Sequence, residues 1–211
     1  MIIKWLGHAS FKVKTQGKTI YIDPYAGEYD DKADVILISH GHHDHCDQDK
    51  ISLILQPESV IITSKECAKQ MTGKITTLSP GEATTIGDIE IVGVEAYNVK
   101  RFREPGLAFH PEGTQIGFLI KSEGKTIYHG ADTDFLPAMK KLTGVDLALV
   151  PIGGTYTMDV EDAVEATLAI HPKKVIPMHC RDADVELFKK EVKTQSDIKV
   201  EVLSEGEELR L

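Results

Sequence analysis

A histidine-rich segment at residues 39–45, with the sequence SHGHHDH, constrains this chain more than any other feature. It directly follows the apolar run Val35–Ile38 and contains four common metal-binding residues in the spacing H-x-H-x-D-H: His40, His42, Asp44 and His45. A short continuous apolar run is typical of a fully buried strand, so the polar cluster lies where a strand ends and a loop begins. Imidazole and carboxylate are donors that suit zinc, iron or manganese. The segment therefore predicts a metal site at a strand end.

The spacing of these four residues favours two metal ions over one. A chain that turns out of a strand can direct His40 and His42 at one ion, while the adjacent Asp44 and His45 diverge and can reach a second ion. A solvated histidine-rich loop is the alternative. It is the weaker interpretation for four donors at this spacing after a buried strand.

Further segments, together with the histidine-rich one, resemble the metallo-β-lactamase superfamily. In chain order they are 5–11 (WLGHASF), 22–24 (IDP), 40–47, 127–133 (IYHGADT), 151–154 (PIGG) and 176–179 (IPMH). The resemblance covers nearly the whole chain and points to the branch that contains proteins similar to ascorbate-phosphate lactonase and N-acyl-phosphatidylethanolamine phospholipase D. It implies an α/β fold that is a four-layer αββα sandwich, with two mixed β-sheets flanked by helices.

The residue pattern is consistent with that order of layers. Short strands are predicted at 2–7, 11–15, 19–23, 35–39, 60–63, 75–78, 89–96, 116–121, 126–128, 147–150, 175–178, 199–203 and 209–211. Helices are predicted at 50–55, 65–71, 159–170 and 182–192, with Asp159 as an N-cap. The one long irregular stretch, 100–113, is of a length that is often functional. Without a linker or repeat, we expect one domain spanning residues 1–211.

Composition limits the partners of the chain. The net charge of −9, from 33 acidic and 24 basic residues, disfavours binding to nucleic acid. A small-molecule substrate is expected, and Lys100, Arg101 and Arg103 would hold it if it is anionic; otherwise they form a solvated loop. No apolar run approaches the roughly 18 residues that span a bilayer, and the N-terminus lacks a signal-peptide pattern, so we expect a cytoplasmic protein. The sequence is compatible with a homo-oligomer and does not identify a particular assembly.

Two later residues extend the predicted ligand set. Asp132 and His179 stand at or just past the ends of apolar strands, where several strand ends can converge on one cleft. The resemblance assigns Asp132 as the carboxylate that bridges both metals and His179 as a ligand of the second. The resemblance does not directly identify the third ligand of the first metal, because the superfamily has a histidine where this chain has Asn98. We favour His110 as its replacement, with Asn98 as a donor behind it or as a weak oxygen ligand.

Other residues are expected around the metals. Asp23, at a strand end, is suited to orienting the His40 loop through the far nitrogen of a ligand histidine. His8 either contacts substrate or a ligand carboxylate, or is a buried structural histidine. Tyr156, in a glycine-containing turn before a helix, is a candidate wall of the pocket, whereas His129 is expected to be structural.

These residues predict a metal-dependent hydrolase. Two divalent ions, zinc by preference and otherwise manganese or iron, would generate a metal-bound hydroxide that cleaves a small ester, lactone or phosphodiester. Asp132 and Asp44 are the predicted catalytic carboxylates, the second positioning the hydroxide or accepting a proton. Two alternatives are an iron-dependent redox protein of the same fold and a non-catalytic metal-binding module. The departure at Asn98 is the feature that favours the last of these.

Overall fold

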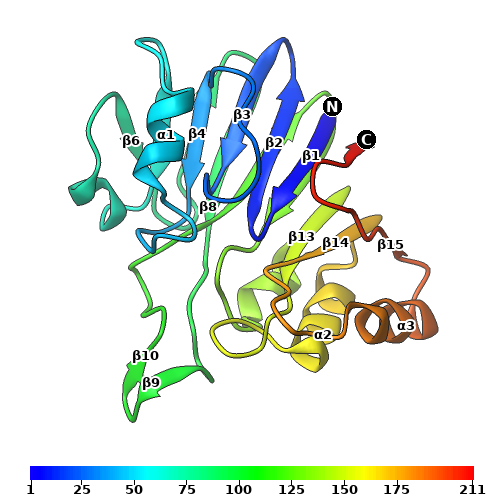
Figure 1. Ribbon diagram of the computed structural model, residues 1–211. Coiled ribbons are helices and arrows are strands. Elements are labelled where there is room, and N and C mark those ends of the chain that lie inside the picture. The colour runs from blue at the N-terminus through cyan, green and yellow to red at the C-terminus, as the bar shows by residue number, and fades with distance from the viewer.

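The apolar runs of the sequence form two seven-stranded mixed sheets in the computed structural model, which describes residues 1–211 (Figure 1). The first sheet has the order β16-β1-β2-β3-β4-β5-β6, made by Glu208–Arg210, Ile2–Gly7, Ser10–Thr15, Lys18–Ile22, Val35–Ile38, Val60–Thr63 and Ile75–Thr77. The second has the order β15-β14-β13-β12-β11-β8-β7, made by Lys199–Val200, Lys174–Met178, Leu147–Pro151, Lys125–His129, Gly117–Ser122, Ile89–Val94 and Ala83–Ile86.

Each sheet changes from antiparallel to parallel pairing along its width. In the first sheet, β16, β1, β2 and β3 pair antiparallel, whereas β3 to β6 pair parallel. In the second, the antiparallel strands are β7, β8, β11 and β12, and the parallel ones are β12 to β15. The parallel strands carry polar residues just beyond their carboxyl ends, and several of these become site residues.

Three apolar clusters hold the layers together. The largest lies between the two sheets, and the two others lie between each sheet and its covering helices. Strand β4 illustrates why its four residues are all apolar: Val35 and Leu37 face the central cluster, whereas Ile36 and Ile38 face the outer one under α1 (Gln48–Ile54). Helices α2 (Val160–Ile170) and α3 (Val185–Gln195) cover the second sheet. The predicted αββα sandwich is confirmed.

Two of the helix predictions need correction. Residues 65–71 form only a short 3₁₀ helix, η1 (Cys67–Gln70), because Met71 is extended and Gly73 adopts φ +118, which leaves room for a single turn before β6. The last helix starts three residues later than predicted, at Val185, because Asp184 is extended and its side chain caps the N–H of Leu187. The predicted N-cap Asp159 is present and accepts from the N–H of Asp162.

The sequence does not predict three short strands, because none of them shows clear apolar alternation. The stretch 100–113, predicted as irregular, contains a hairpin of β9 (Phe102–Glu104) and β10 (Leu107–Ala108) that projects from the body of the molecule (Figure 1). Gly106 in its turn adopts φ +82, which glycine accommodates without strain. Edge strand β7 was also missed, because Ile86 is its only large apolar residue.

The remaining 3₁₀ helix, η2 (Pro137–Lys141), packs with α2 on the outer face of the second sheet. None of the helices has the length and apolarity that crossing a membrane requires.

Candidate metal centre

The histidine-rich segment turns sharply after β4, and its first residue is held by Asp23. One carboxylate oxygen of Asp23 accepts from the backbone N–H of Ser39 at 2.7 Å, and the other accepts from its hydroxyl at 2.7 Å. The backbone N–H of His45 then donates to the carbonyl oxygen of His42 at 3.0 Å, which closes the turn. Within this turn, the side chain of His43 is exposed to solvent.

A first group of donors consists of three histidines. Nδ1 of His42 lies 3.1 Å from Nε2 of His40 and 3.1 Å from Nε2 of His110, and all three residues are within reach of one ion. A hydrogen bond to Ser39 orients the ring of His40. Because the Ser39 hydroxyl donates its hydrogen to Asp23, its oxygen accepts from Nδ1 of His40, at 2.9 Å. That bond leaves the Nε2 lone pair of His40 directed at the other two rings.

A second group consists of His8, Asp44, His45 and His179. Nε2 of His8 lies 3.3 Å from a carboxylate oxygen of Asp44, and the rings of His8 and His179 are 3.9 Å apart between centroids. Nε2 of His8, of His45 and of His179 are all buried and have no hydrogen-bond partner. Buried polar atoms without partners are costly, and a metal ion satisfies such nitrogens together.

Asp132 lies between the two groups. It is 2% exposed, and its carboxylate oxygens lie 3.2 Å from Nε2 of His45, 3.5 Å from Nε2 of His110 and 3.3 Å from Nε2 of His179. It also forms a third possible ligand set with His40 and His45. One carboxylate therefore contacts histidines of both groups.

Two residues orient donor histidines through the second nitrogen of each ring. Asp23, which is fully buried, accepts from Nδ1 of His45 at 2.8 Å and so directs Nε2 of that ring to Asp132. Asn98 does the same for His110, with its side-chain oxygen 2.8 Å from Nδ1 of the ring. The structure thus places His110, and not Asn98, among the converging atoms.

Burial and charge set the protonation of the group. Burial lowers the pKa of the His40 imidazole well below its usual value and lowers the pKa of His110 to about 4, so both rings are neutral at pH 7. Burial alone would raise the pKa of the Asp132 carboxyl, but the facing His45 and His179 outweigh burial and lower it well below its usual value. His45 differs: burial alone would lower its pKa, but the facing carboxylates of Asp132 and Asp23 outweigh burial and raise it well above the usual value. Since neutral imidazoles and ionised carboxylates are the forms that bind metal, binding at His45 would release a proton.

Three further residues singled out from the sequence lie at different distances from the donor groups. His8, considered either an outer contact or structural, lies within the second donor group. Tyr156 is half-buried and packs edge-on against Phe109, the neighbour of His110, with 4.7 Å between ring centroids. His129 lies outside all the donor groups, and its Nε2 is 3.0 Å from the carbonyl oxygen of Ala9.

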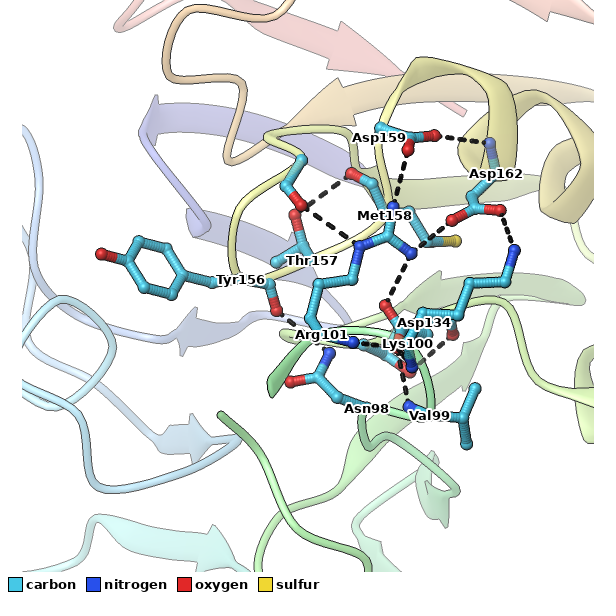
Figure 2. A network of polar contacts seen from close by, with 12 residues as sticks. Asn98, Val99, Lys100, Arg101, Asp134, Tyr156, Thr157, Met158, Asp159 and Asp162 are labelled. Atoms are coloured by element: carbon cyan, nitrogen blue, oxygen red, sulfur yellow. Dashed lines mark hydrogen bonds and ion pairs between the residues drawn. The ribbon is translucent and has the colours of Figure 1, made fainter. Parts of the chain in front are cut away.

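An ion-pair network that the sequence did not reveal fixes the loop between Asn98 and His110 (Figure 2). Arg101 pairs with three aspartates, Asp134, Asp159 and Asp162, and Lys100 pairs with Asp162. Two of the three basic residues proposed to hold an anionic substrate are therefore engaged with carboxylates. Ionic contacts between such distant residues have no periodic signal in a sequence.

A cavity of about 230 Å³ borders the first donor group. Its walls include His40, His42, His110 and Phe109. A larger hollow of about 720 Å³ lies between α2 and α3 and is lined by none of the histidines. Of the two, only the smaller cavity opens onto the first donor group.

Comparison with known proteins gives consistent matches over most of the chain. Residues 2–179 match the family model described as a beta-lactamase superfamily domain. A UPF0173 metal-dependent hydrolase from Pelotomaculum thermopropionicum is 33% identical, with 100% of both chains covered. One from Methanosarcina mazei is 32% identical, with 99% of this chain and 98% of that protein covered. The structure of Igni18, a metallo hydrolase from the archaeon Ignicoccus hospitalis, is 25% identical with a TM-score of 0.82, covering 99% of this chain and 97% of that one.

Proposed function

The chain belongs to the metallo-β-lactamase superfamily, and on that premise we propose that it is a metal-dependent hydrolase with a binuclear metal site. The observation that carries the proposal is the position of Asp132, whose two oxygens face histidines of both donor groups. The relatives described as metal-dependent hydrolases, which align with the whole chain, support the same activity.

We assign the ligands by group. His40, His42 and His110 would hold one ion, Asp44, His45 and His179 would hold the second, and the carboxylate of Asp132 would contribute to both. Zinc fits this set of imidazoles and carboxylates best, and manganese or iron also accept it. The donors come from turns and strand ends of both sheets, so we further propose that residues 1–211 act as one catalytic domain.

When bound, two divalent ions supply an activated water and a Lewis acid that polarises the scissile carbonyl or phosphoryl group. The protein residues provide position and proton transfer. Asp44 is the most accessible carboxylate of the site, with its side chain 37% exposed, and can accept the proton of the attacking water. Nε2 of His8, which lies 3.3 Å from Asp44 without a hydrogen bond to it, is within reach of the second ion. The small cavity suits a small ester, lactone or phosphodiester.

The test combines metal content with hydrolysis. Elemental analysis of the purified wild type should give two divalent ions per chain, and a panel of chromogenic esters, lactones and phosphodiesters should reveal hydrolysis. Asp132→Asn should lose metal and activity together, whereas Asp88→Asn, in the exposed β7–β8 turn, should retain both.

A second pair of variants distinguishes loss of a proposed ligand from loss of any histidine in the same segment. His42→Ala should lose one ion, whereas the adjacent His43→Ala, whose side chain is 76% exposed, should keep two. Unchanged metal and activity in Asp132→Asn would refute the proposal. Bound iron without hydrolysis would instead support the redox alternative.

A further inference from the structure

Two arginines beside the donor groups have no acidic partner. Arg103 on β9 and Arg181 after β14 are exposed and take part in no ion pair, although the chain has 33 acidic residues. Arg101, by contrast, is held by three aspartates. An unpaired guanidinium offers five N–H donors in a rigid planar fork that matches carboxylate and phosphate geometry. These two side chains are therefore free to bind an anion.

The two guanidiniums stand at the ends of a row of four side chains. Cζ of Arg103 lies 5.5 Å from the ring centroid of Phe109, which meets the ring of Tyr156 edge-on. At the other end, Cζ of Arg181 lies 5.0 Å from the Tyr156 centroid. Contact with an aromatic face holds a guanidinium while leaving its N–H groups available. The row presents two positioned cations with apolar surface between them.

This row runs along the proposed metal ligands. Nη2 of Arg103 lies 3.5 Å from Nε2 of His42, and Phe109 directly precedes His110. With a metal ion on Nδ1 of His42, its Nε2 would carry the hydrogen and would not accept from Arg103. The donors of Arg103 then have no acceptor on His42 and are available to an anion that enters beside it.

The other end of the row is fixed by an unusual turn. His179 and Arg181 both adopt left-handed backbone conformations, with φ of 50° and 49°, which are uncommon for residues other than glycine. The turn packs directly on Gly153, where a Cβ atom would lie 2.3 Å from the carbonyl oxygen of His179 and 3.4 Å from Cδ of Arg181. Gly153 thus allows the same turn to carry a metal ligand and a cation.

We propose that Arg103 and Arg181 select a substrate that carries an oxyanion, a carboxylate or a phosphate, near the bond to be cleaved, and that Phe109 and Tyr156 pack against its apolar part. This inference rests on the proposed hydrolase function and names the substrate class of the same site. It also gives the hairpin a role, since β9 carries Arg103.

The kinetic test uses the metal-loaded protein and three esters of one leaving group: 4-nitrophenyl acetate, 4-nitrophenyl hydrogen succinate and 4-nitrophenyl phosphonoacetate. The first ester is neutral, the second carries a carboxylate and the third carries a phosphonate, so the last two distinguish the kinds of oxyanion. The ratio of kcat/KM for an anionic ester to that for the neutral one should fall about tenfold in Arg103→Met and in Arg181→Met. Metal content should stay at the wild-type value. Arg210→Met is the matched control, because Arg210 on β16 pairs with Ile2, at the opposite end of β1 from His8.

A binding measurement separates failure of this inference from failure of the hydrolase proposal. Calorimetric titration compares benzenesulfonate, a poor metal ligand, with its uncharged analogue methyl phenyl sulfone. The sulfonate should bind the wild type more tightly than the sulfone does, and each variant at Arg103 or Arg181 should weaken it about tenfold. If no ester is hydrolysed but this binding pattern holds, the hydrolase proposal fails for esters and the anion site stands. Equal ester ratios, or equal sulfonate binding in the wild type and both variants, would overturn the inference.

Discussion

The side-chain oxygen of Asn98 lies 2.9 Å from the backbone nitrogen of His110 and 2.8 Å from Nδ1 of its ring. An amide oxygen only accepts hydrogen bonds, so this contact places the ring hydrogen on Nδ1 and leaves the lone pair on Nε2, the atom that faces His42. The amide nitrogen of Asn98 donates to the carbonyl oxygen of Tyr156 at 3.0 Å, which fixes the orientation of the amide. Asn98 therefore sets the direction and tautomer of His110.

This relationship predicts how Asn98 supports the first donor group. Asn98→Ala should weaken metal binding there by about 10- to 100-fold, the effect expected when the partner of a ligand histidine is lost. His110→Ala should abolish binding of that ion, because it removes the donor atom itself. Titration against a competing chelator measures both affinities. Wild-type affinity in Asn98→Ala, together with loss of the ion in His110→Ala, would show that the ring needs no orienting bond.

The part of the site foreseen from the sequence is the part encoded locally. His40, His42, Asp44 and His45 lie within one turn after a buried strand, and strand ends meet at one edge of a sheet, so their proximity follows from pattern alone. The position of Asp132 follows from the same reasoning about strand ends, and its proposed role as a bridging ligand from family resemblance.

The rest of the site depends on contacts between distant parts of the chain. His8 in the β1–β2 turn meets His179 after β14, and this contact has no signature in the spacing of either residue. The bonds of Arg101 likewise join the hairpin loop to the start of α2. Neither polar contact changes the apolar periodicity from which helices and strands are predicted. The sequence therefore predicts the fold more completely than the surroundings of the candidate metal centre.

His8 is expected to support the second donor group. Its Nε2 is buried without a hydrogen-bond partner and lies 3.3 Å from Asp44, so His8→Ala should weaken binding of the second ion by about 10- to 100-fold and leave the first ion in place. His171→Ala, which removes a histidine with a side chain 66% exposed at the end of α2, is the control. Two ions bound with wild-type affinity in His8→Ala would limit His8 to contact with substrate.

Arg101 is expected to stabilise the fold as well as the loop. Its side chain is 10% exposed, and its removal leaves the buried carboxylates of Asp134 and Asp162 without their common cation. Breaking a buried ion pair on one side costs about 3–5 kcal/mol, so Arg101→Met should lower the free energy of unfolding by about 3 kcal/mol or more. Lys100→Met, at a side chain that is 58% exposed, should lower it by about 0–1 kcal/mol. Urea unfolding checks both, and equal stability of the two variants would contradict the expectation.

The same network predicts how stability depends on pH. Burial alone would raise the pKa of the Asp162 carboxyl, but its bonds to Lys100 and Arg101 outweigh burial and lower the pKa below the ordinary value of 3.8. The folded chain therefore takes up this proton less readily than the unfolded chain. Ionised Asp162 stabilises the fold fully above the unfolded pKa, and that contribution is lost as the pH falls through the lowered folded pKa.

Asp162→Asn should accordingly be less stable than the wild type at neutral pH, and the difference should shrink below about pH 4. Urea midpoints measured from neutral to acidic pH in the presence of a chelator test this, because both proteins are then free of metal throughout. Asp88→Asn, at an exposed carboxylate outside every ion pair, should show a difference that varies little with pH. A constant gap between the wild type and Asp162→Asn down to about pH 3 would mean that Asp162 stabilises the fold through packing instead of through its charge.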